Sequence, residues 1–219
     1  MTQARSFLFA ILFAAGLGSC ATPATREPGN LSVAKNQVKA YVDSGAYNAD
    51  LAAAAKPAMD WITRRANSGI AKPAVVFDID ETTLSNLDHM TKFDWGYQPA
   101  SWSKWVLESK ATAIRPAREV FLTARAHHVS VFFITGRRQS EKAATARNLR
   151  AQGMGDFAEM FVRSDSSQTP IKAFKTSARK QLTDQGYTII ANVGDQQSDL
   201  DGGYAQRTFK LPNPFYLIP

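Results

Sequence analysis

Three apolar runs, each followed at once by polar residues, stand out along this chain of 219 residues. They cover residues 75–77, 129–134 and 187–193 and are rich in β-branched and aromatic side chains. Continuous runs of this kind are typical of strands buried on both faces of a parallel sheet. A helix is expected to start near Phe174, between the second and third runs. The pattern predicts an α/β domain with a central, mostly parallel sheet.

Residues 31–68 precede the first run and show the spacing of helices rather than strands. The period is broken at Ser44 and Gly45, which predicts two helices instead of one long one. We expect both helices to pack on the core with a purely structural role. The apolar positions that support this prediction include Leu31, Val38, Val42, Leu51, Met59 and Ile62.

Two acidic residues, Asp78 and Asp80, come directly after the first run. Open α/β sheets place their ligand crevices outside the carboxyl ends of the strands. Two carboxylates there can share a divalent cation, or they can divide the roles of nucleophile and acid/base. The alternative is structural: one acid caps a helix N-terminus while the other is solvated.

The other two runs also end in residues that could bind a substrate or take part in a reaction. Thr135, Gly136 and Arg137 follow the second run and offer donors for a phosphate oxygen. Residues 194–199, after the third run, contain Asp195 and Asp199. Lys175 lies near the expected helix start and could reach a phosphoryl group.

Taken in order, these segments resemble the four motifs of the haloacid dehalogenase (HAD) superfamily of phosphotransferases. The resemblance is to its acid phosphatase branch, subfamily IIIB, which includes bacterial class C acid phosphatases and plant vegetative storage proteins. It covers about residues 30–212, and residues 83–87 and 186–196 are similar to the plant branch. Some of those plant relatives lack the nucleophilic aspartate, so the presence of Asp78 favours an enzyme. The motifs are Asp78-Ile79-Asp80-Glu81-Thr82, Ile134-Thr135-Gly136-Arg137, Phe174-Lys175-Thr176-Ser177 and Gly194-Asp195-Gln196-Gln197-Ser198-Asp199-Leu200.

The resemblance implies a Rossmann-like three-layer sandwich with N-terminal helices and a small helical cap inserted at about residues 86–115. The phosphatase domain would occupy residues 31–219. The implied activity is that of a magnesium-dependent acid phosphatase acting on small phosphomonoesters, with nucleoside monophosphates as candidate substrates. Two alternatives stay open: a surface lipoprotein that mainly binds a ligand or partner on this fold, and phosphotransfer to an acceptor other than water.

The resemblance also implies a role for each motif residue. Asp78 would attack phosphorus to form an aspartyl-phosphate, and Asp80 would act as general acid and then general base. Magnesium would bind an oxygen of Asp78, the backbone carbonyl of Asp80 and the side chain of Asp195, with support from Asp199. Thr135, the Gly136 backbone and Lys175 would hold the phosphoryl oxygens; Lys172 and Lys180 fit the family pattern less well.

The expected cap region is unusually aromatic. Trp102 and Trp105 are spaced i, i+3 and suit the apolar core of a small helical cap. Trp95 and Tyr97 flank Gly96 in an expected loop. In related class C enzymes, aromatic residues from this region stack on the base of a nucleotide, so we predict that Trp95 and Tyr97 bind substrate. The alternative is that they too belong to the core of the cap.

Other polar residues carry weaker expectations. Arg137 is interpreted either as a substrate clamp or as an exposed structural arginine, and Asn86 resembles a family position near the cap hinge. No RHG-type cluster surrounds His89, His127 or His128, which disfavours a histidine phosphatase. We expect the three histidines to be solvated or structural.

Composition narrows the functional classes. A hydrophobic content of 44% is ample for one α/β core. The formal net charge is +7, or +6 without residues 1–19, but no basic run exceeds two residues. Dispersed cations argue against a nucleic acid polymer as partner and favour attraction of small anionic substrates. The sequence does not indicate the oligomeric state.

The N-terminal residues predict export. Arg5 precedes an apolar run at residues 7–15, which is too short for the ~20 residues of a membrane-spanning helix. Residues 17–20 resemble a bacterial lipoprotein cleavage box, which implies a signal peptide at 1–19, lipidation of Cys20 and a tether at 20–30. Cys20 is the only cysteine, so no intramolecular disulfide can form. We expect a periplasm-facing or surface lipoprotein; the alternative is cleavage near Ala21 and a soluble periplasmic enzyme.

Overall fold

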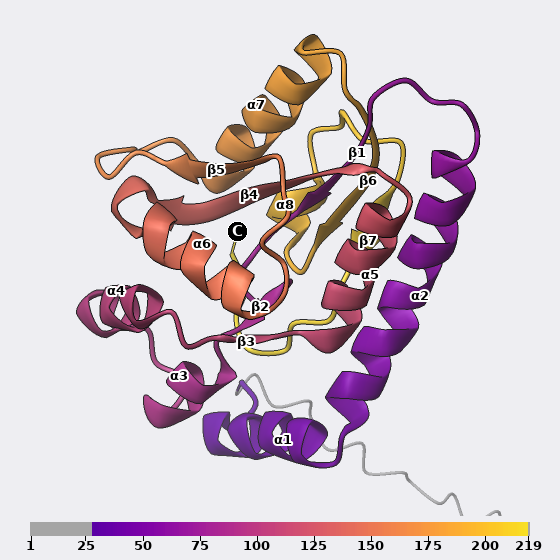
Figure 1. The fold of residues 1–219 in the computed structure, drawn as a ribbon. Coiled ribbons are helices and arrows are strands. Elements are labelled where there is room, and N and C mark those ends of the chain that lie inside the picture. The colour runs from indigo at the N-terminus through magenta and orange to yellow at the C-terminus, as the bar shows by residue number, and fades with distance from the viewer. Residues whose placement is uncertain (1–27, 219) are drawn as a thin grey trace, which may run out of the picture.

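Five parallel strands form one sheet with the order β5-β4-β1-β6-β7 in the computed structural model, which describes residues 28–218 (Figure 1). A second sheet pairs β2 and β3 antiparallel. The parallel sheet confirms the predicted α/β class. The strands are β1 Pro73–Phe77, β2 Leu84–Ser85, β3 Thr112–Ala113, β4 Ser130–Arg138, β5 Glu159–Arg163, β6 Thr188–Gly194 and β7 Thr208–Lys210.

The three apolar runs become the three central strands. β1, β4 and β6 are buried along most of their length, as expected for strands covered on both faces. One boundary differs from the prediction, because β4 continues to Arg138 instead of ending at Ile134. Its register with β5 shifts between these two residues. Thr135 and Gly136 therefore belong to the strand, although the regular pairing with β5 is interrupted there.

Helices cover both faces of the sheet and produce three layers. α2 (Ala46–Ala66), α5 (Arg115–Ala126) and α6 (Lys142–Ala151) contribute to the larger core on one face, while α7 (Ile171–Asp184) covers the other. Neighbouring residues of β1 point to opposite layers: Val75 belongs to the larger core and Val76 to the smaller one. The predicted three-layer sandwich is confirmed.

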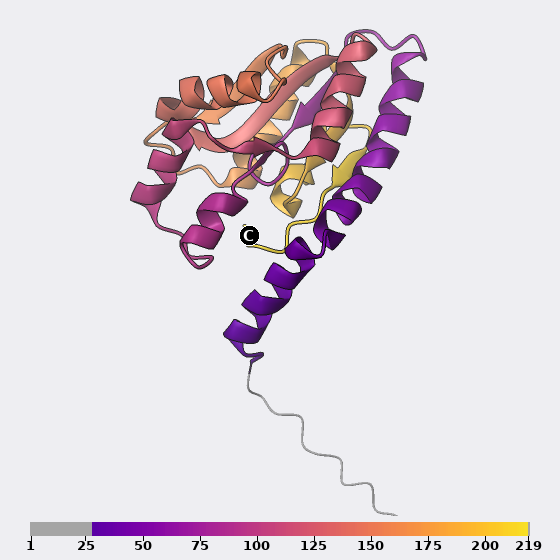
Figure 2. The same cartoon turned by 60° about the horizontal axis from the view of Figure 1, so that its bottom comes forward.

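The predicted break at Ser44 and Gly45 separates α1 (Leu31–Asp43) from α2, so two helices form as expected. Their roles differ, however. α2 packs on the core, whereas α1 has no buried residue and reaches the core only through Tyr41 and Val42. Figure 2 shows α1 projecting from the body of the molecule. Within residues 28–218, none of the helices has the length and apolarity to cross a membrane.

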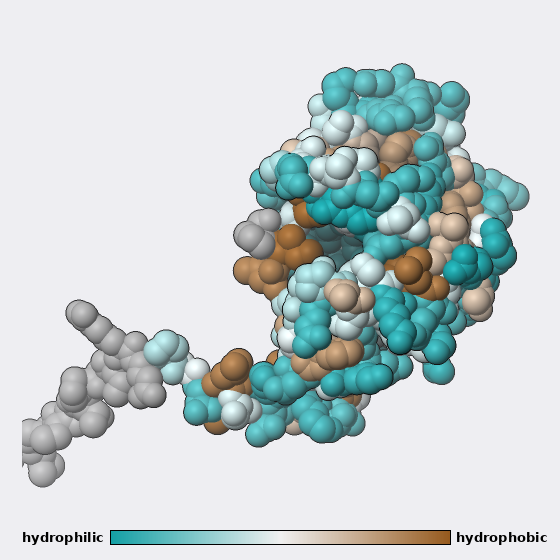
Figure 3. Space-filling model, turned by 90° about the vertical axis from the view of Figure 1, so that its left-hand side faces the viewer, coloured by the Kyte–Doolittle hydropathy of each residue, from teal (hydrophilic) through white to brown (hydrophobic). Residues whose placement is uncertain are grey.

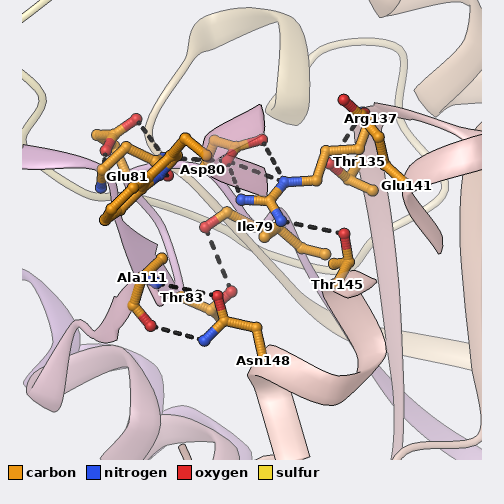
Figure 4. A network of polar contacts seen from close by, with 12 residues as sticks. Ile79, Asp80, Glu81, Thr83, Ala111, Thr135, Arg137, Glu141, Thr145 and Asn148 are labelled. Atoms are coloured by element: carbon orange, nitrogen blue, oxygen red, sulfur yellow. Dashed lines mark hydrogen bonds and ion pairs between the residues drawn. The ribbon is translucent and has the colours of Figure 1, made fainter. Parts of the chain in front are cut away.

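The insert between β2 and β3 contains α3 (Leu87–Lys92) and α4 (Pro99–Glu108), and pairing of the two strands closes it. His89 is buried at its centre, with ring centroids 5.6 Å from Trp102 and 5.9 Å from Trp105. We call residues 86–113 the cap. Asn148 on α6 fixes the start of the return strand, because its side chain bonds both backbone groups of Ala111 (Figure 4). Two short helices complete the fold, η1 (Gln139–Glu141) and α8 (Gln197–Leu200).

Candidate active site

Four predicted site residues meet at the carboxyl edge of the sheet. Asp78 directly follows β1, Asp195 follows β6, Asp199 lies on α8 and Lys175 lies in the second turn of α7. One carboxylate oxygen from each aspartate lies within 4.8 Å of the others, and all three side chains are buried. We call these four residues the carboxylate cluster. Parallel strands and their crossovers bring the four together although more than a hundred residues separate the first from the last.

Lys175 lies between two of the carboxylates. Its Nζ contacts Asp78 and lies 2.6 Å from Oδ1 of Asp199. Burial raises the pKa of Asp78 well above its usual range, and the charge of Lys175 lowers it only in part. Burial and the nearby charge of Asp199 raise the pKa of Asp195 as well. Burial favours neutral Lys175, but Asp78 and Asp199 outweigh it and raise the lysine pKa. One cation therefore faces three carboxylates with little water.

The carboxylate cluster fits a hard divalent cation. With all groups ionised it carries an excess of two negative charges in a buried space, and its available ligands are oxygens. Asp195 is also held in place, as metal ligands usually are. Thr82, Gln196 and Asn213 each donate a hydrogen bond of 2.7 Å to its carboxylate.

Asp80 has a different environment although it is only two residues from Asp78. Its side chain accepts hydrogen bonds from Arg137 Nη2 at 2.7 Å and from Asn86 Nδ2 at 3.0 Å (Figure 4). Arg137 Nε lies 3.1 and 3.2 Å from the two carboxylate oxygens, and Nη1 donates to Thr145 at 3.0 Å. The Asp80 side chain is 19% exposed and the Arg137 side chain 2%. An exposed structural arginine is therefore the wrong interpretation of Arg137, which positions Asp80.

Glu81 connects this region to the cap and to the C-terminal segment 212–218. It is buried, accepts from the Asn86 backbone at 2.7 Å and from Tyr216 Oη at 2.5 Å. Burial, followed by the charge of Asp80, raises the pKa of Glu81 to about 8. Asn86 in turn accepts from Trp105 Nε1 of α4 at 2.8 Å. We call Asp80, Glu81, Asn86 and Arg137 the Asp80 network.

The predicted phosphate-binding residues lie at the end of β4, beside β1. Thr135 is buried, and its Oγ1 accepts from the backbone N–H of Arg137 at 3.2 Å. Gly136 faces a cleft that Asp80 also lines. A Cβ on Gly136 would come within 3.2 Å of Ile171 Cδ1, so glycine keeps this backbone accessible. β4 pairs with β1, so both residues lie next to the segment that carries Asp78 and Asp80. Their role in phosphate binding stays a prediction.

The cleft has a volume of about 630 Å³ and lies between the cap, the end of β4 and residues 212–218. Trp95 and Tyr97 both line it. Trp95 stacks on Phe215 with an interplanar angle of 13° and centroids 5.4 Å apart, while Tyr97 is 71% exposed. Figure 3 shows a hydrophilic hollow with hydrophobic surface at its edges. The cleft therefore offers a polar floor and aromatic walls.

Arg179 is a site residue that the sequence interpretation missed. It is 1% exposed, and it donates to the backbone carbonyls of Asp199 at 2.6 Å, of Gly203 at 2.9 Å and of Asp201. It thereby fixes the loop that carries Asp199. Its spacing of four residues from Lys175 places both on one face of α7, which is a signal that the sequence did contain.

Comparisons with known proteins agree with this arrangement. Residues 25–219 match the family described as HAD superfamily, subfamily IIIB (Acid phosphatase). The chain is 33% identical over 148 residues to Acid phosphatase 1 of Solanum lycopersicum, covering 65% of this chain and 58% of that protein. It is 34% identical over 154 residues to the Stem 28 kDa glycoprotein of Glycine max, covering 67% and 61%. The chain thus spans about three fifths of the length of these relatives.

The fold is also similar to that of a class C acid phosphatase from Bacillus anthracis, solved with tungstate bound. The TM-score is 0.70 at 20% identity, covering 85% of this chain and 87% of that one. This likeness supports the architecture, while the family match covers the motifs themselves. The chain belongs to the acid phosphatase subfamily IIIB of the HAD superfamily.

Proposed function

We propose that this protein is a magnesium-dependent phosphatase that hydrolyses phosphomonoesters through an aspartyl-phosphate. The observation that carries the proposal is the division of labour between Asp78 and Asp80. Asp78 lies beside Lys175 and two further carboxylates, where a phosphoryl group and a cation can both bind. Asp80 faces the cleft that would hold the leaving group. This arrangement supports a nucleophile and a proton donor on two sides of one reacting centre.

In the first step, a carboxylate oxygen of Asp78 attacks phosphorus and the bond to the ester oxygen breaks. Asp80 gives its proton to the departing alkoxide, which leaves as an alcohol. In the second step, Asp80 takes a proton from water, whose oxygen attacks the same phosphorus. The bond to Asp78 breaks, so the aspartate is regenerated and inorganic phosphate is released. Arg137 and Asn86 keep Asp80 oriented in both steps.

Charge on the transferred phosphoryl group has to be stabilised throughout. The Lys175 ammonium, the Thr135 hydroxyl and the Gly136 backbone N–H would bind the equatorial oxygens. Asp78, Asp195, Asp199 and the backbone carbonyl of Asp80 would hold magnesium, which supplies electrostatic stabilisation of the same oxygens. Positioning and electrostatics are thus the main contributions of the protein.

For the substrate, we propose a small phosphomonoester whose leaving group carries a flat aromatic ring, such as a nucleoside monophosphate. Trp95 and Phe215 form one stacked wall of the cleft, and Tyr97 is exposed beside Trp102. Aromatic faces of this kind stack on nucleobases. In a Trp95→Ala/Tyr97→Ala double variant, kcat/KM for a nucleoside monophosphate should fall more than for a small alkyl phosphate. An unchanged ratio would remove the support for base stacking.

The direct test of the activity uses purified protein with magnesium and p-nitrophenyl phosphate. Turnover should require the metal, disappear with a chelator and return when magnesium is added. Asp78→Asn should retain the fold, as shown by circular dichroism, and lose turnover. A module that only binds ligand would show equal, background rates in both proteins. Adding an alcohol and measuring phosphorylated alcohol against phosphate separates hydrolysis from phosphotransfer.

We also propose that the protein is exported and anchored through lipid on Cys20, which lies outside the described residues. The support is the sequence pattern of residues 5–20 alone. Expression in a bacterium with labelled palmitate should label the wild-type protein and leave Cys20→Ala unlabelled. Label on both proteins, or on neither, would argue against acylation at this position.

A further inference from the structure

Two arginines outside the proposed catalytic machinery lie at the edge of the same cleft. Arg138 at the end of β4 and Arg163 at the end of β5 are register partners, and both line the cleft. Like charges opposite each other on neighbouring strands destabilise a sheet. Within residues 28–218, neither guanidinium is among the ion pairs. We call these residues the arginine pair.

The nearby acids form their hydrogen bonds with other groups, although the charge of Arg138, after the Ser140 hydrogen bonds, contributes to lowering the pKa of Asp165. Glu141 Oε2 accepts from the backbone N–H of Arg138 at 2.8 Å, not from its side chain. Asp165 accepts from the backbone and hydroxyl of Ser140, at 3.1 and 2.7 Å. The third guanidinium in the cleft, that of Arg137, is held by Asp80. The arginine pair is therefore the part of the cleft whose positive charge is not matched by a bonded carboxylate in the described chain.

Backbone carbonyls of the loop 164–170 hold the two side chains in place. Arg138 Nη1 donates to Ser164 and Ser167 at 3.0 Å each, while Arg163 Nη2 donates to Ser167 at 3.2 Å and Thr169 at 2.6 Å. The two guanidiniums thus share the carbonyl of Ser167. These hydrogen bonds use one nitrogen of each side chain, and Arg163 Nε is buried with no partner in the described structure. Fixed arginines with unused donors are suited to an oxyanion.

Two further observations agree with an anion at this position. Burial, and then the charge of Arg138, lowers the pKa of Arg163, because both disfavour its charged form. α7 starts nearby at Ile171, which also lines the cleft, and no side chain caps this helix N-terminus. The partial positive charge of a helix N-terminus adds to that of the two guanidiniums.

We propose that the arginine pair binds a second oxyanion on the leaving group of the substrate. The substrate class is then a small phosphomonoester that carries another phosphoryl or carboxylate group besides the one that is cleaved. This inference rests on the proposed phosphatase function and specifies its substrate. Asp80 and Gly136 line the same cleft as the arginine pair, which supports binding of the second anion in the same complex as the scissile phosphate.

The test compares matched substrates that differ only in the second anion. Adenosine 3′,5′-bisphosphate against adenosine 5′-monophosphate tests a second phosphate; 3-carboxyphenyl phosphate against phenyl phosphate tests a carboxylate. Arg138→Gln should lower kcat/KM roughly tenfold for the substrate with the extra anion, as expected when a charge-assisted hydrogen bond is lost. The rate for its partner substrate should not change. Arg138→Lys, which keeps the charge, should recover part of the loss.

Arg150→Gln is the matched control, because Arg150 is an exposed residue on α6 and its replacement changes the net charge equally. An effect in the phosphate arm alone assigns the site to phosphoryl groups, and one in the carboxylate arm alone assigns it to carboxylates. Equal losses for all four substrates, or the same pattern with Arg150→Gln, would overturn the proposal.

The proposed function and this inference can fail separately. If the wild-type protein turns over none of the substrates, the phosphatase proposal fails. Calorimetry on the Asp78→Asn protein then decides the second site without turnover. Adenosine 3′,5′-bisphosphate should bind roughly tenfold more tightly than adenosine 5′-monophosphate, and Arg138→Gln should abolish the difference. Equal affinities in the Asp78→Asn protein would reject the site.

Discussion

Asp78 and Asp80 are neighbours in sequence but belong to regions that work by different physics. In the carboxylate cluster, three buried acids and one lysine share a small space, and burial raises the pKa of Asp78. In the Asp80 network, a partly exposed carboxylate is held by neutral and cationic donors at fixed distances. The first region stores electrostatic stress that a bound cation would relieve. The second fixes an orientation.

The end of one strand provides both of these distinct acids. After Phe77 the chain leaves the sheet, and Glu81 adopts a positive φ of 55° within the turn. Asp78 thus stays next to β6 and α7, while Asp80 faces β4 and the cap.

Asp78→Asn should abolish turnover with every substrate, a loss of about 10⁴-fold or more, because the nucleophile is gone. Asp80→Asn should be selective. Its kcat should fall far more with an alkyl phosphate than with p-nitrophenyl phosphate, whose leaving group needs little protonation. Steady-state kinetics on both substrates measures the difference. Equal losses in the Asp80 variant would show that the two aspartates do not have separate roles.

Lys175→Met should lower kcat by about 10³-fold, because the variant loses a donor to the phosphoryl oxygens. It should also leave three buried carboxylates without a cation, so magnesium should raise the melting temperature more in the variant than in wild type. Calorimetry with and without the metal measures this. Lys172→Met is the control, since Lys172 is exposed and pairs with Asp201. If magnesium raised the melting temperature of Lys175→Met no more than that of wild type, the proposed electrostatic role of Lys175 would be contradicted.

Arg137→Lys should lower kcat by about 10²-fold, because lysine keeps the charge but cannot hold both oxygens of Asp80. The effect should appear in kcat, since Asp80 loses its fixed donors. KM for p-nitrophenyl phosphate should change little. A large rise in KM with an unchanged kcat would instead identify Arg137 as a substrate clamp.

Asn213→Ala should weaken magnesium binding by about tenfold and leave kcat at saturating metal nearly unchanged. Asn213 donates to Asp195 at 2.7 Å but belongs to the C-terminal segment, and support of this kind usually tunes metal affinity. Titration of activity with magnesium gives the affinity. An unaltered titration curve would mean that Thr82 and Gln196 are enough to position Asp195.

The smallest expected effect is that of His89→Gln on the pH dependence of protein stability, because His89 is a buried residue of the cap. Burial lowers its pKa below the ordinary 6.5, so protonation favours the unfolded state. This contribution is present above pH 6.5 and is lost as the pH falls through the folded-state pKa. The melting temperature of wild type should therefore drop more than that of His89→Gln between pH 7.5 and 5. His128→Gln serves as an exposed control; identical curves for all three proteins would exclude the cap histidine as the source.

The carboxylate cluster was predictable from the sequence because two of its members directly follow recognisable strands. Asp78 and Asp195 come after apolar runs, and parallel strands align their carboxyl ends. Two helices before β1, the aromatic core of the cap and the neighbourhood of Lys175 were also predictable from periodicity and motif order. In each case the pattern lies in a short stretch of sequence. The parallel sheet then brings the residues at the ends of its strands close together.

The Asp80 network could not be predicted in the same way. The Arg137–Asp80 ion pair depends on the rotamer of Arg137. The same sequence is equally compatible with an Arg137 side chain that points into solvent. Tyr216 and Asn213 contact the site from an irregular segment that has no hydrophobic period. The arginine pair depends on the register shift between β4 and β5, which no pattern in the sequence marks.

The strand order has a consequence for how the chain folds during synthesis. Val76 of β1 pairs with Phe132 on one side and with Asn192 on the other. β1 can therefore form hydrogen bonds along both edges only after most of the polypeptide has been synthesised. Contacts so distant in sequence slow folding, and they leave the apolar run of β1 accessible to chaperones in the meantime. Residues up to Asn192 must therefore be available before β1 is paired on both sides and the two aspartates take up their separate positions.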